Sequence, residues 1–280
     1  MISILILTKN EQQDLPDCLK SVSWSDDVHV FDSMSTDGTL ALAEQFGAHV
    51  TQRGYGESKL AFGGDESAHR NWGLKNIPFK YEWVFVIDAD ERMTPELVQA
   101  SQEAVRSARE LVAFRVQRRD FFMGTWLKHV QTSPYYIRLF RPEKMRYERL
   151  INCVSIVDGP VGQVTGYLDH LPFSKGIGNW VDRHNAYSSF EARQIISNRE
   201  VGERFSAKKA FVGGDFHTRR YHQKGLFYSL PFRPLIKFLF LYIFKLGFLD
   251  GRAGFTYATL VAIYEYFIVL KTRELQRPPR

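Results

Sequence analysis

Short apolar runs alternate with polar loops through the first third of the chain. Residues 2–7, 28–31 and 83–87 are such runs, and each is followed at once by several polar side chains. Runs of this length predict strands that are buried on both faces, as in a parallel sheet. Ligands of open α/β sheets bind just beyond the carboxyl ends of the strands, so these polar ends predict a binding site.

The segments between the runs have the apolar spacing of helices. Leu15, Leu19 and Val22 share one helical face, and residues 40–46 repeat this spacing after the second run. Pro95 begins a further helix, at a position where proline is tolerated. This alternation of strands and helices predicts an α/β fold. Further strands are expected at residues 113–116, 135–141 and 154–157.

The third run ends in three carboxylates, which are Asp88, Asp90 and Glu91. Asp88 and Asp90 are two residues apart, so in an extended segment their side chains point the same way. Two converging carboxylates form an oxygen site for Mg²⁺ or Mn²⁺, and such an ion can bind the diphosphate of a nucleotide. The alternative interpretation is a strand that is followed by an acidic turn without a ligand.

Composition narrows the class of protein only a little. The 280 residues include 37 basic and 31 acidic side chains, which gives a net charge of +6. This mild charge does not predict nucleic-acid binding. Cys18 and Cys153 are the only cysteines and lack metal-type spacing, which indicates a reducing compartment. The N-terminus lacks the pattern of a signal peptide, so a cytoplasmic protein is expected.

Three motifs follow the predicted strands in order: T-K-N-E at residues 8–11, D-S-M-S-T-D-G-T at 32–39 and D-A-D-E at 88–91. Together they resemble the family 2 glycosyltransferases, which are inverting enzymes of the GT-A nucleotide-diphospho-sugar fold. R-L-F-R at 138–141 and H-N-A-Y-S at 184–188 resemble the bacterial branch that builds lipopolysaccharide cores and exopolysaccharides. The resemblance implies a mixed, mainly parallel sheet flanked by helices, with a C-terminal amphipathic helical extension.

The resemblance also implies roles for the residues at the strand ends. It places the first loop against the nucleoside and assigns Asp32 to the uracil imide N–H, which suits a carboxylate because it only accepts hydrogen bonds. Ser35 is alternatively a cap of the next helix. Arg70 suits phosphate as a bidentate fork, or lies on a solvated helix face. The expected donor-binding residues are Thr8, Asn10, Glu11, Asp32, Ser35, Arg70, Asn71, Asp88 and Asp90, with Asp90 and Asp88 as metal ligands.

Inverting transfer also needs a base for the acceptor hydroxyl. In the bacterial branch a glutamate follows the R-L-F strand, and here Cys153 stands at the position where that glutamate is expected. A neutral thiol is a poor substitute for a carboxylate. Three explanations stay open: Asp158 or Glu148 is the base, the acceptor is a phosphate that needs no base, or this copy is altered at the site.

The chain is expected to divide into three parts. Residues 1–117 form the nucleotide-sugar-binding half of a GT-A domain, and residues 118–230 form its acceptor-side half. Residues 231–280 form an apolar, amphipathic extension that associates with a membrane.

The extension contains two apolar segments, residues 235–246 and 253–270, with basic residues at their ends. A buried helical hairpin, helices in the membrane interface and a transmembrane pair are the three interpretations. Glu265 and the charged residues Asp250 and Arg252 favour the interface, because charges at the bilayer centre are unfavourable.

These features predict a metal-dependent glycosyltransferase that moves a sugar from a nucleotide-diphosphate donor, a UDP-sugar, to a lipid-linked or lipid A-core glycan of the bacterial envelope. The expected cofactor is Mn²⁺ or Mg²⁺, and the expected place is the cytoplasmic face of the inner membrane. One alternative is a polyprenyl-phosphate glycosyltransferase, which the missing glutamate favours. The other is a degenerate, non-enzymatic scaffold of a glycan-assembly complex, which the intact D-A-D-E motif disfavours.

Overall fold

The chain forms two compact units in a computed structural model that describes residues 1–54, 66–148, 153–200, 205–212 and 216–276. The first unit contains residues 1–126 and 133–175, and the second contains residues 127–132 and 176–280. The expected boundaries at residues 117 and 230 do not coincide with this division. The sheet continues to residue 170, and the helices before residue 230 belong with the C-terminal ones.

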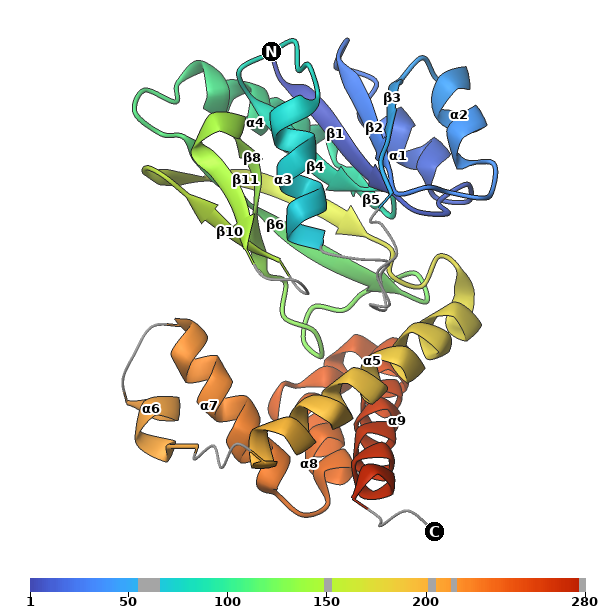
Figure 1. Cartoon of the computed structure of the whole chain (residues 1–280), viewed down its shortest axis with the longest axis vertical. Coiled ribbons are helices and arrows are strands. Elements are labelled where there is room, and N and C mark those ends of the chain that lie inside the picture. Colours follow the sequence, from blue (N-terminus) through green and yellow to red (C-terminus); the bar gives the residue numbers. More distant parts are fainter. Residues whose placement is uncertain (55–65, 149–152, 201–204, 213–215, 277–280) are drawn as a thin grey trace. The chain divides into compact units, whose positions relative to one another are not determined.

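The first unit is built on one mixed sheet, with the strand order β3-β2-β1-β4-β8-β6-β11-β5 and β7 beside β6 among the described residues (Figure 1). Neighbouring strands from β3 to β4 are parallel, β8 is antiparallel to β4 and β6, and β11 is parallel to β6. The strands are β1 (Ser3–Thr8), β2 (Val28–Asp32), β3 (His49–Gln52), β4 (Val84–Asp88), β5 (Glu91–Met93), β6 (Ala113–Phe122), β7 (Thr125–Trp126), β8 (Tyr135–Phe140) and β11 (Val161–His170).

Helices cover both faces of this sheet and bury its alternating side chains. Ile4 and Ile6 of β1 pack with Leu15 and Leu97 in one core cluster, whereas Leu5 packs on the opposite face. A two-stranded pair, β9 (Met145–Glu148) and β10 (Val154–Val157), lies beside α3 on that opposite face. The predicted α/β class, with helices on both faces of the sheet, is therefore confirmed. The helices are α1 (Leu15–Ser21), α2 (Thr39–Gln45), α3 (Glu66–Asn76) and α4 (Pro95–Arg106).

Strand β11 is absent from the sequence-based prediction because its apolar residues are interspersed with polar ones. It is held in place by a close approach to α4 at Gly166, whose φ is +89°. A Cβ atom there would lie 2.7 Å from the backbone nitrogen of Leu97, so only glycine permits this packing. The contact fixes the strand that carries His170 at its carboxyl end.

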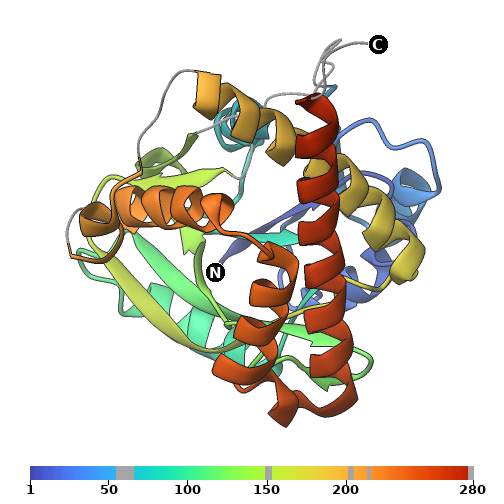
Figure 2. The same ribbon diagram turned by 90° about the horizontal axis from the view of Figure 1, so that it is seen from below.

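The second unit is helical. Its elements are α5 (Gly176–Glu200), α6 (Ala207–Phe211), α7 (Phe216–Ser229), α8 (Arg233–Leu239), the π-helical turn η2 (Phe240–Phe244), the 3₁₀ turn η3 (Gly247–Asp250) and α9 (Gly251–Leu275). Helix α9 packs along both α5 and α8, as Figures 1 and 2 show. The predicted C-terminal helical extension is thus confirmed: α8 with η2 covers most of the first apolar segment, and α9 contains the second.

Residues 127–132 lie between β7 and β8 in the sequence but pack with the helical unit. Asp250, which is 7% exposed, accepts hydrogen bonds from the backbone N–H of Val130 at 2.8 Å and of His129 at 3.0 Å. Tyr257 of α9 donates to Gln131 over 2.8 Å. This carboxylate therefore satisfies buried backbone donors and does not face solvent.

Candidate active site

The carboxyl end of β4 is a tight turn rather than an extended segment. Strand β4 ends at Asp88, residues 89 and 90 form the turn, and β5 begins at Glu91. The backbone N–H of Asp88 donates to Glu91 Oε2 over 2.9 Å, which closes the turn. The expectation that Asp88 and Asp90 point the same way depended on extended backbone, so the two side chains meet different partners.

Asp88 faces two arginines. Its Oδ2 accepts from Arg138 over 2.8 Å, and its Oδ1 lies 3.8 Å from Arg70. Burial raises the pKa of the Asp88 carboxyl, but the two guanidinium groups outweigh that effect and hold the pKa below its usual range. Asp88 is therefore an ionised carboxylate that is already neutralised by protein cations.

Glu91 is fully buried beside the same arginine. Arg138 donates to its Oε1 over 2.6 Å, and Arg118 lies 3.8 Å from the same oxygen. Burial raises the pKa of Glu91 to about 6, although Arg138 opposes that rise. The third carboxylate of the D-A-D-E motif thus anchors Arg138 of the R-L-F-R motif.

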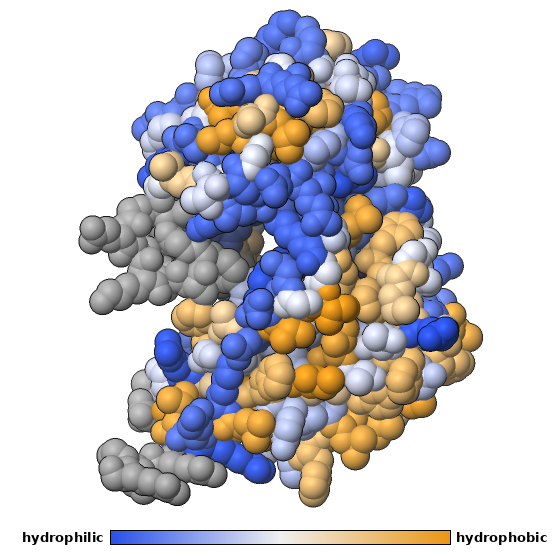
Figure 3. Space-filling model, turned by 90° about the vertical axis from the view of Figure 1, so that its right-hand side faces the viewer, coloured by the Kyte–Doolittle hydropathy of each residue, from blue (hydrophilic) through white to orange (hydrophobic). Residues whose placement is uncertain are grey.

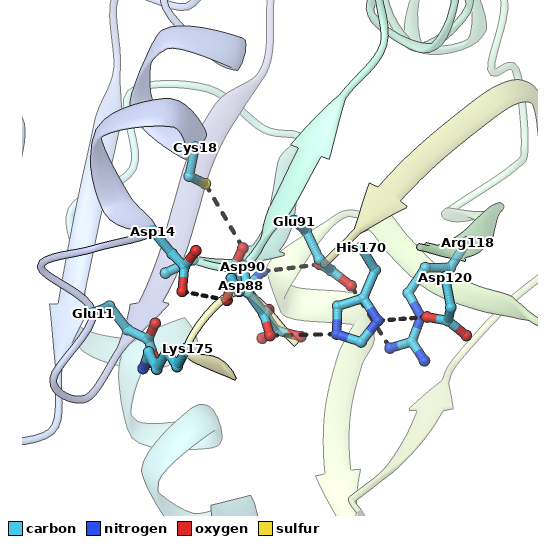
Figure 4. Close-up of polar contacts among 12 residues, drawn as sticks. Glu11, Asp14, Cys18, Asp88, Asp90, Glu91, Arg118, Asp120, His170 and Lys175 are labelled. Carbon is cyan, nitrogen blue, oxygen red and sulfur yellow. Dashed lines mark hydrogen bonds and ion pairs between the residues drawn. The ribbon is translucent and has the colours of Figure 1, made fainter. Parts of the chain in front are cut away.

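Asp90 faces His170, which lies at the end of β11 (Figure 4). The distance from Asp90 Oδ2 to His170 Nε2 is 3.3 Å, and the other ring nitrogen of His170 is hydrogen-bonded to Asp120. Burial lowers the pKa of His170, but Asp120 and Asp90 outweigh it and raise the pKa to about 9. The structure therefore places an imidazole between two carboxylates at the carboxyl ends of three strands.

His170 is a candidate site residue that the sequence analysis missed. The signal was present, because polar Asp169 and His170 directly follow Leu168 at a strand end, as in the three recognised motifs. Among the described residues no group of three His, Cys, Asp or Glu side chains is arranged to hold a metal ion. A metal at this site would thus have Asp90 and His170 as its protein ligands and would take its remaining ligands from substrate or water.

Thr8, Asp32 and Ser35 form one hydrogen-bonded group at the ends of β1 and β2. Asp32 Oδ1 accepts from the hydroxyls of Thr8 at 2.8 Å and Ser35 at 2.5 Å. Its Oδ2 accepts from the backbone N–H of Ser35 at 2.8 Å and from Gln52 at 3.0 Å. The four donors use the acceptor capacity of this fully buried carboxylate.

Asn10 and Glu11 belong to a loop that Lys175 contacts. Lys175 Nζ lies 2.7 Å from the carbonyl oxygen of Asn10 and 2.6 Å from Glu11 Oε1. Burial raises the pKa of Glu11 to about 7, Lys175 opposes the rise, and Asp90 and Asp14 add to it. Figure 4 shows this pair near the β4–β5 turn. The structure thus brings Glu11 to the same edge of the sheet as Asp90.

Arg70 and Asn71 of α3 serve different purposes. Arg70 donates to Glu66 Oε1 over 2.8 and 2.9 Å and stacks on the ring of Tyr147 at 5.3 Å. Asn71 bonds both the backbone N–H and the carbonyl of Tyr147, at 2.7 and 2.8 Å. The amide of Asn71 therefore holds β9 against α3, and only Arg70 of the two reaches a carboxylate of the β4 turn.

The three candidate positions for the base lie on the β9–β10 pair or the turn that follows it. Glu148 ends β9 next to Tyr147, and Cys153 precedes β10 and packs partly buried against an apolar cluster. Asp158 lies in the turn before β11, and its side chain is 81% exposed. The ten residues of β11 separate that turn from His170, roughly 30 Å at 3.3 Å per residue. The structure does not bring Asp158 to the carboxylate cluster.

Residues 3–159 match the family described as Glycosyl transferase family 2, which is more than half of the chain, and the chain belongs to this family. It is therefore a glycosyltransferase, and the predicted GT-A fold class is confirmed. The lipopolysaccharide core biosynthesis glycosyltransferase LpsC of Rhizobium meliloti (strain 1021) is 28% identical over 276 residues, 96% of this chain and 91% of that protein. The uncharacterized glycosyltransferase RP128 of Rickettsia prowazekii (strain Madrid E) is 34% identical over 210 residues, 70% of this chain and 68% of that protein.

Two solved structures are more distant. Staphylococcus aureus TarS 1–349 has a TM-score of 0.43 and 14% identity, over 99% of this chain and 93% of that chain. Glucosyl-3-phosphoglycerate synthase from Mycobacterium tuberculosis, in complex with Mn²⁺, UDP-glucose and phosphoglyceric acid, has a TM-score of 0.35 and 22% identity, over 42% of this chain and 44% of that chain. Both TM-scores are below 0.5, which is too low to transfer a ligand or a role.

The raised pKa of Glu11 predicts a pH-dependent contribution to stability. Because the folded state binds this proton more tightly than the unfolded state, the free energy of unfolding falls as pH rises from about 4.5 to about 7. The loss is on the order of 3 kcal/mol at most. Glu11→Gln should remove this pH-dependent loss of stability and raise the melting temperature at pH 8. Melting curves of both proteins between pH 4.5 and 8 test this, and parallel profiles would contradict it, because Glu91 contributes equally to both.

Proposed function

We propose that this chain is an inverting, metal-dependent glycosyltransferase that moves a sugar from a UDP-sugar to a lipid-linked or lipid A-core glycan of the bacterial envelope. The observation that carries the proposal is the pairing of Asp90 with His170 at the carboxyl ends of β4 and β11. Membership of family 2 and the lipopolysaccharide core biosynthesis name of the Rhizobium relative support it.

The chemistry of Asp90 and His170 fits Mn²⁺ or Mg²⁺. Asp120 accepts from Nδ1 of His170, which fixes the ring and directs Nε2 toward Asp90 Oδ2. Carboxylate and imidazole suit Mn²⁺, and Mg²⁺ commonly takes one or two carboxylates together with substrate phosphates. The bound ion would stabilise the negative charge that develops on the departing diphosphate. His170 must lose its proton to act as a ligand, so donor binding with the metal should weaken at low pH.

Asp88 and the two arginines form the side of the proposed donor site next to α3. Asp88 keeps both guanidinium groups near the turn, with Arg138 at 2.8 Å and Arg70 at 3.8 Å. We assign Arg70 to the donor phosphates, because it is the more weakly paired of the two with Asp88. Asp88 then orients these cations or contacts the ribose, and Asp90 takes the metal.

The nucleoside is assigned to the loop that Asp32 holds together. Asp32 already accepts hydrogen bonds from four donors. This supports a role for Asp32 in positioning Thr8 and Ser35 around the base, rather than a direct bond to the uracil imide. Asn10 supports the same loop, since its side-chain oxygen accepts from the backbone N–H of Thr36 over 2.8 Å.

Of the two candidate carboxylate bases, Glu148 lies at the end of the β9–β10 pair nearer Arg70, whereas Asp158 lies at the other end. The Glu148 side chain is on the exposed face of β9, opposite that of Tyr147, and pairs with Arg146 over 3.1 Å, so it would have to leave this ion pair to act as the base. Cys153, opposite this end of β9, packs against apolar side chains and offers no carboxylate. That cysteine favours a second candidate function, a polyprenyl-phosphate glycosyltransferase, whose acceptor is ionised and needs no base.

The helical unit is assigned to the surface of the membrane. Large apolar side chains are exposed along α8, η2, η3 and α9, and Figure 3 shows apolar side chains gathered over the helical unit on the face that it draws. Basic residues accompany them and suit anionic headgroups. We call the exposed set Phe232, Leu235, Leu239, Phe240, Ile243, Phe244, Leu246, Phe248, Leu249 and Phe255 the apolar face.

One helical run among the described residues, Gly247–Leu275, is long and apolar enough to cross a membrane. Glu265 within this run does not oppose lipid contact, because it lies 3.3 Å from Arg233 and both side chains are only 6% exposed. The packing of α5 does oppose crossing. Lys271 of α9 donates to Asn185 and Ser188 of α5, a helix that exposes the charged side chains of Asp182, Arg183 and Arg193. A position in the membrane interface on the cytoplasmic side is therefore the proposal.

Asp90→Asn and His170→Asn should each abolish Mn²⁺-enhanced binding of UDP and all sugar transfer, because each removes one of two protein ligands. Calorimetric titration of UDP with and without Mn²⁺ measures this, with melting temperature as the check on folding. Asp169→Asn is the matched control, since it neighbours His170 on β11 but pairs with Arg119. A UDP affinity that does not depend on Mn²⁺, or an equal loss of UDP affinity in the control, would refute the metal site.

Glu148→Gln should slow transfer to a hydroxyl acceptor by about a hundredfold or more, the range expected for loss of a general base. UDP binding should stay unchanged. Glu143→Gln, which alters another exposed glutamate near β9, is the control. Undiminished transfer by Glu148→Gln, together with turnover of a polyprenyl phosphate, would favour the second candidate function.

Leu235→Ser combined with Phe244→Ser should weaken binding to vesicles that contain anionic lipid by about tenfold or more, because each side chain loses burial worth about 1.5–3 kcal/mol. High salt should weaken binding of the unmodified protein. Phe211→Ser is the matched control, because Phe211 is 72% exposed on α6, outside the apolar face. Equal loss in the control would reject the assigned face, and protease access to residues 247–254 from the periplasmic side of the membrane would show that α9 crosses.

A further inference from the structure

The segment between β11 and α5, residues 171–175, is tied to both loops of the proposed donor site. The backbone N–H of Leu171 donates to the carbonyl oxygen of Asp90 over 2.9 Å. Ser174 donates to Asp14 Oδ2 over 2.8 Å, and its carbonyl accepts from Gln13 over 2.7 Å. These bonds hold the segment at the edge of the sheet where β1 and β4 end. The last residue of the segment, Lys175, is not among the donor-binding residues that the motifs suggest.

The ammonium group of Lys175 has two oxygen partners among the described residues. It lies 2.6 Å from Glu11 Oε1 and 2.7 Å from the carbonyl oxygen of Asn10, and the side chain is 27% exposed. Glu11 in turn depends on this lysine, because its other oxygen, Oε2, is buried without a hydrogen-bond partner among the described residues. A buried carboxylate oxygen without a hydrogen-bond partner destabilises the folded state, so its presence suggests a functional role.

The arginines at this edge are more heavily engaged. Arg138 is bonded to Asp88 and Glu91, and Arg70 is bonded twice to Glu66 and faces Asp88. A donor diphosphate brings about two negative charges to this edge of the sheet. Lys175 can pair with that charge after breaking a single ion pair, and its flexible four-carbon stem allows the ammonium group to move.

We infer that Lys175 is a donor-binding residue, which pairs with Glu11 in the unliganded protein and moves to the donor diphosphate when the nucleotide sugar binds. Glu11 then acts as a placeholder that keeps the lysine at the site and competes with the donor for it. The inference rests on the proposed function, since it assumes a nucleotide-diphosphate donor at the ends of β1 and β4.

The two partners should therefore respond to substitution with opposite signs. Lys175→Gln removes a cation from the diphosphate and should weaken UDP by about ten- to hundredfold, the range for a hydrogen bond to a charged group. Glu11→Gln removes the competitor and should raise UDP affinity. If the pair were only a structural tie between the loop and the segment, both substitutions would weaken UDP.

The test is calorimetric titration of UDP, at fixed Mn²⁺, into the unmodified protein, Lys175→Gln, Lys175→Arg, Glu11→Gln and the control Lys20→Gln. Lys20 pairs with Asp17 on the exposed side of α1, so its loss should not change affinity. Lys175→Arg keeps the charge and should retain most of the affinity. This arm and Glu11→Gln keep the inference testable should Lys175→Gln prove poorly folded.

Unchanged affinity in Lys175→Gln, or a loss in Glu11→Gln as large as that in Lys175→Gln, would overturn the inference while leaving the proposed function standing. Failure of the unmodified protein to bind UDP with either Mn²⁺ or Mg²⁺ would instead overturn the proposed function and this inference with it. The two failures are therefore distinguishable in one set of titrations.

Discussion

A single buried guanidinium holds the centre of the sheet unit together. Arg138 is 8% exposed and lies within 2.8 Å of both Asp88 and Glu91. Unpaired charges in a protein interior are very unfavourable, and truncating one partner of such a group leaves the others unsatisfied. Without Arg138, the fully buried Glu91 and the partly exposed Asp88 would repel each other, and Glu91 would favour its protonated form. The tight turn between β4 and β5 is stable because this arginine neutralises both of its ends.

The same interaction separates the carboxylates of the D-A-D-E motif by task. Asp88 and Glu91 are occupied by arginine, and the turn between them presents Asp90 to His170 instead. Two adjacent carboxylates could both bind the same cation. Here, instead, the carboxylate of Asp90 faces the imidazole of His170. The proposed metal site thus draws its ligands from strands that are far apart in the sequence, which ties its geometry to correct packing of β11 against α4 through Gly166.

The sequence was sufficient to predict the strands that are buried on both faces, because such positions require an uninterrupted run of apolar residues. It was insufficient for β11, where polar residues interrupt the apolar ones. The orientation of Asp88 could not be read locally either, because it is decided by Arg138, fifty residues further along. Asn71 illustrates the reverse case, since a polar residue in a suggestive position proves to hold the backbone of β9. Residue type predicts which chemistry is available, and packing decides which groups are left to perform it.

The helical unit follows the same rule in an apolar setting. Hydropathy alone counts Asp250 and Glu265 as obstacles to lipid contact, yet Asp250 binds buried backbone N–H groups and Glu265 pairs with Arg233. Because one carboxylate is hydrogen-bonded and the other is ion-paired inside the unit, neither opposes contact of the apolar face with lipid. In the proposed interfacial position, insertion would be limited by the polar helix α5, which Lys271 joins to α9. An apolar face on one side and a charged helix on the other is the arrangement that favours the boundary between lipid and water over either phase alone.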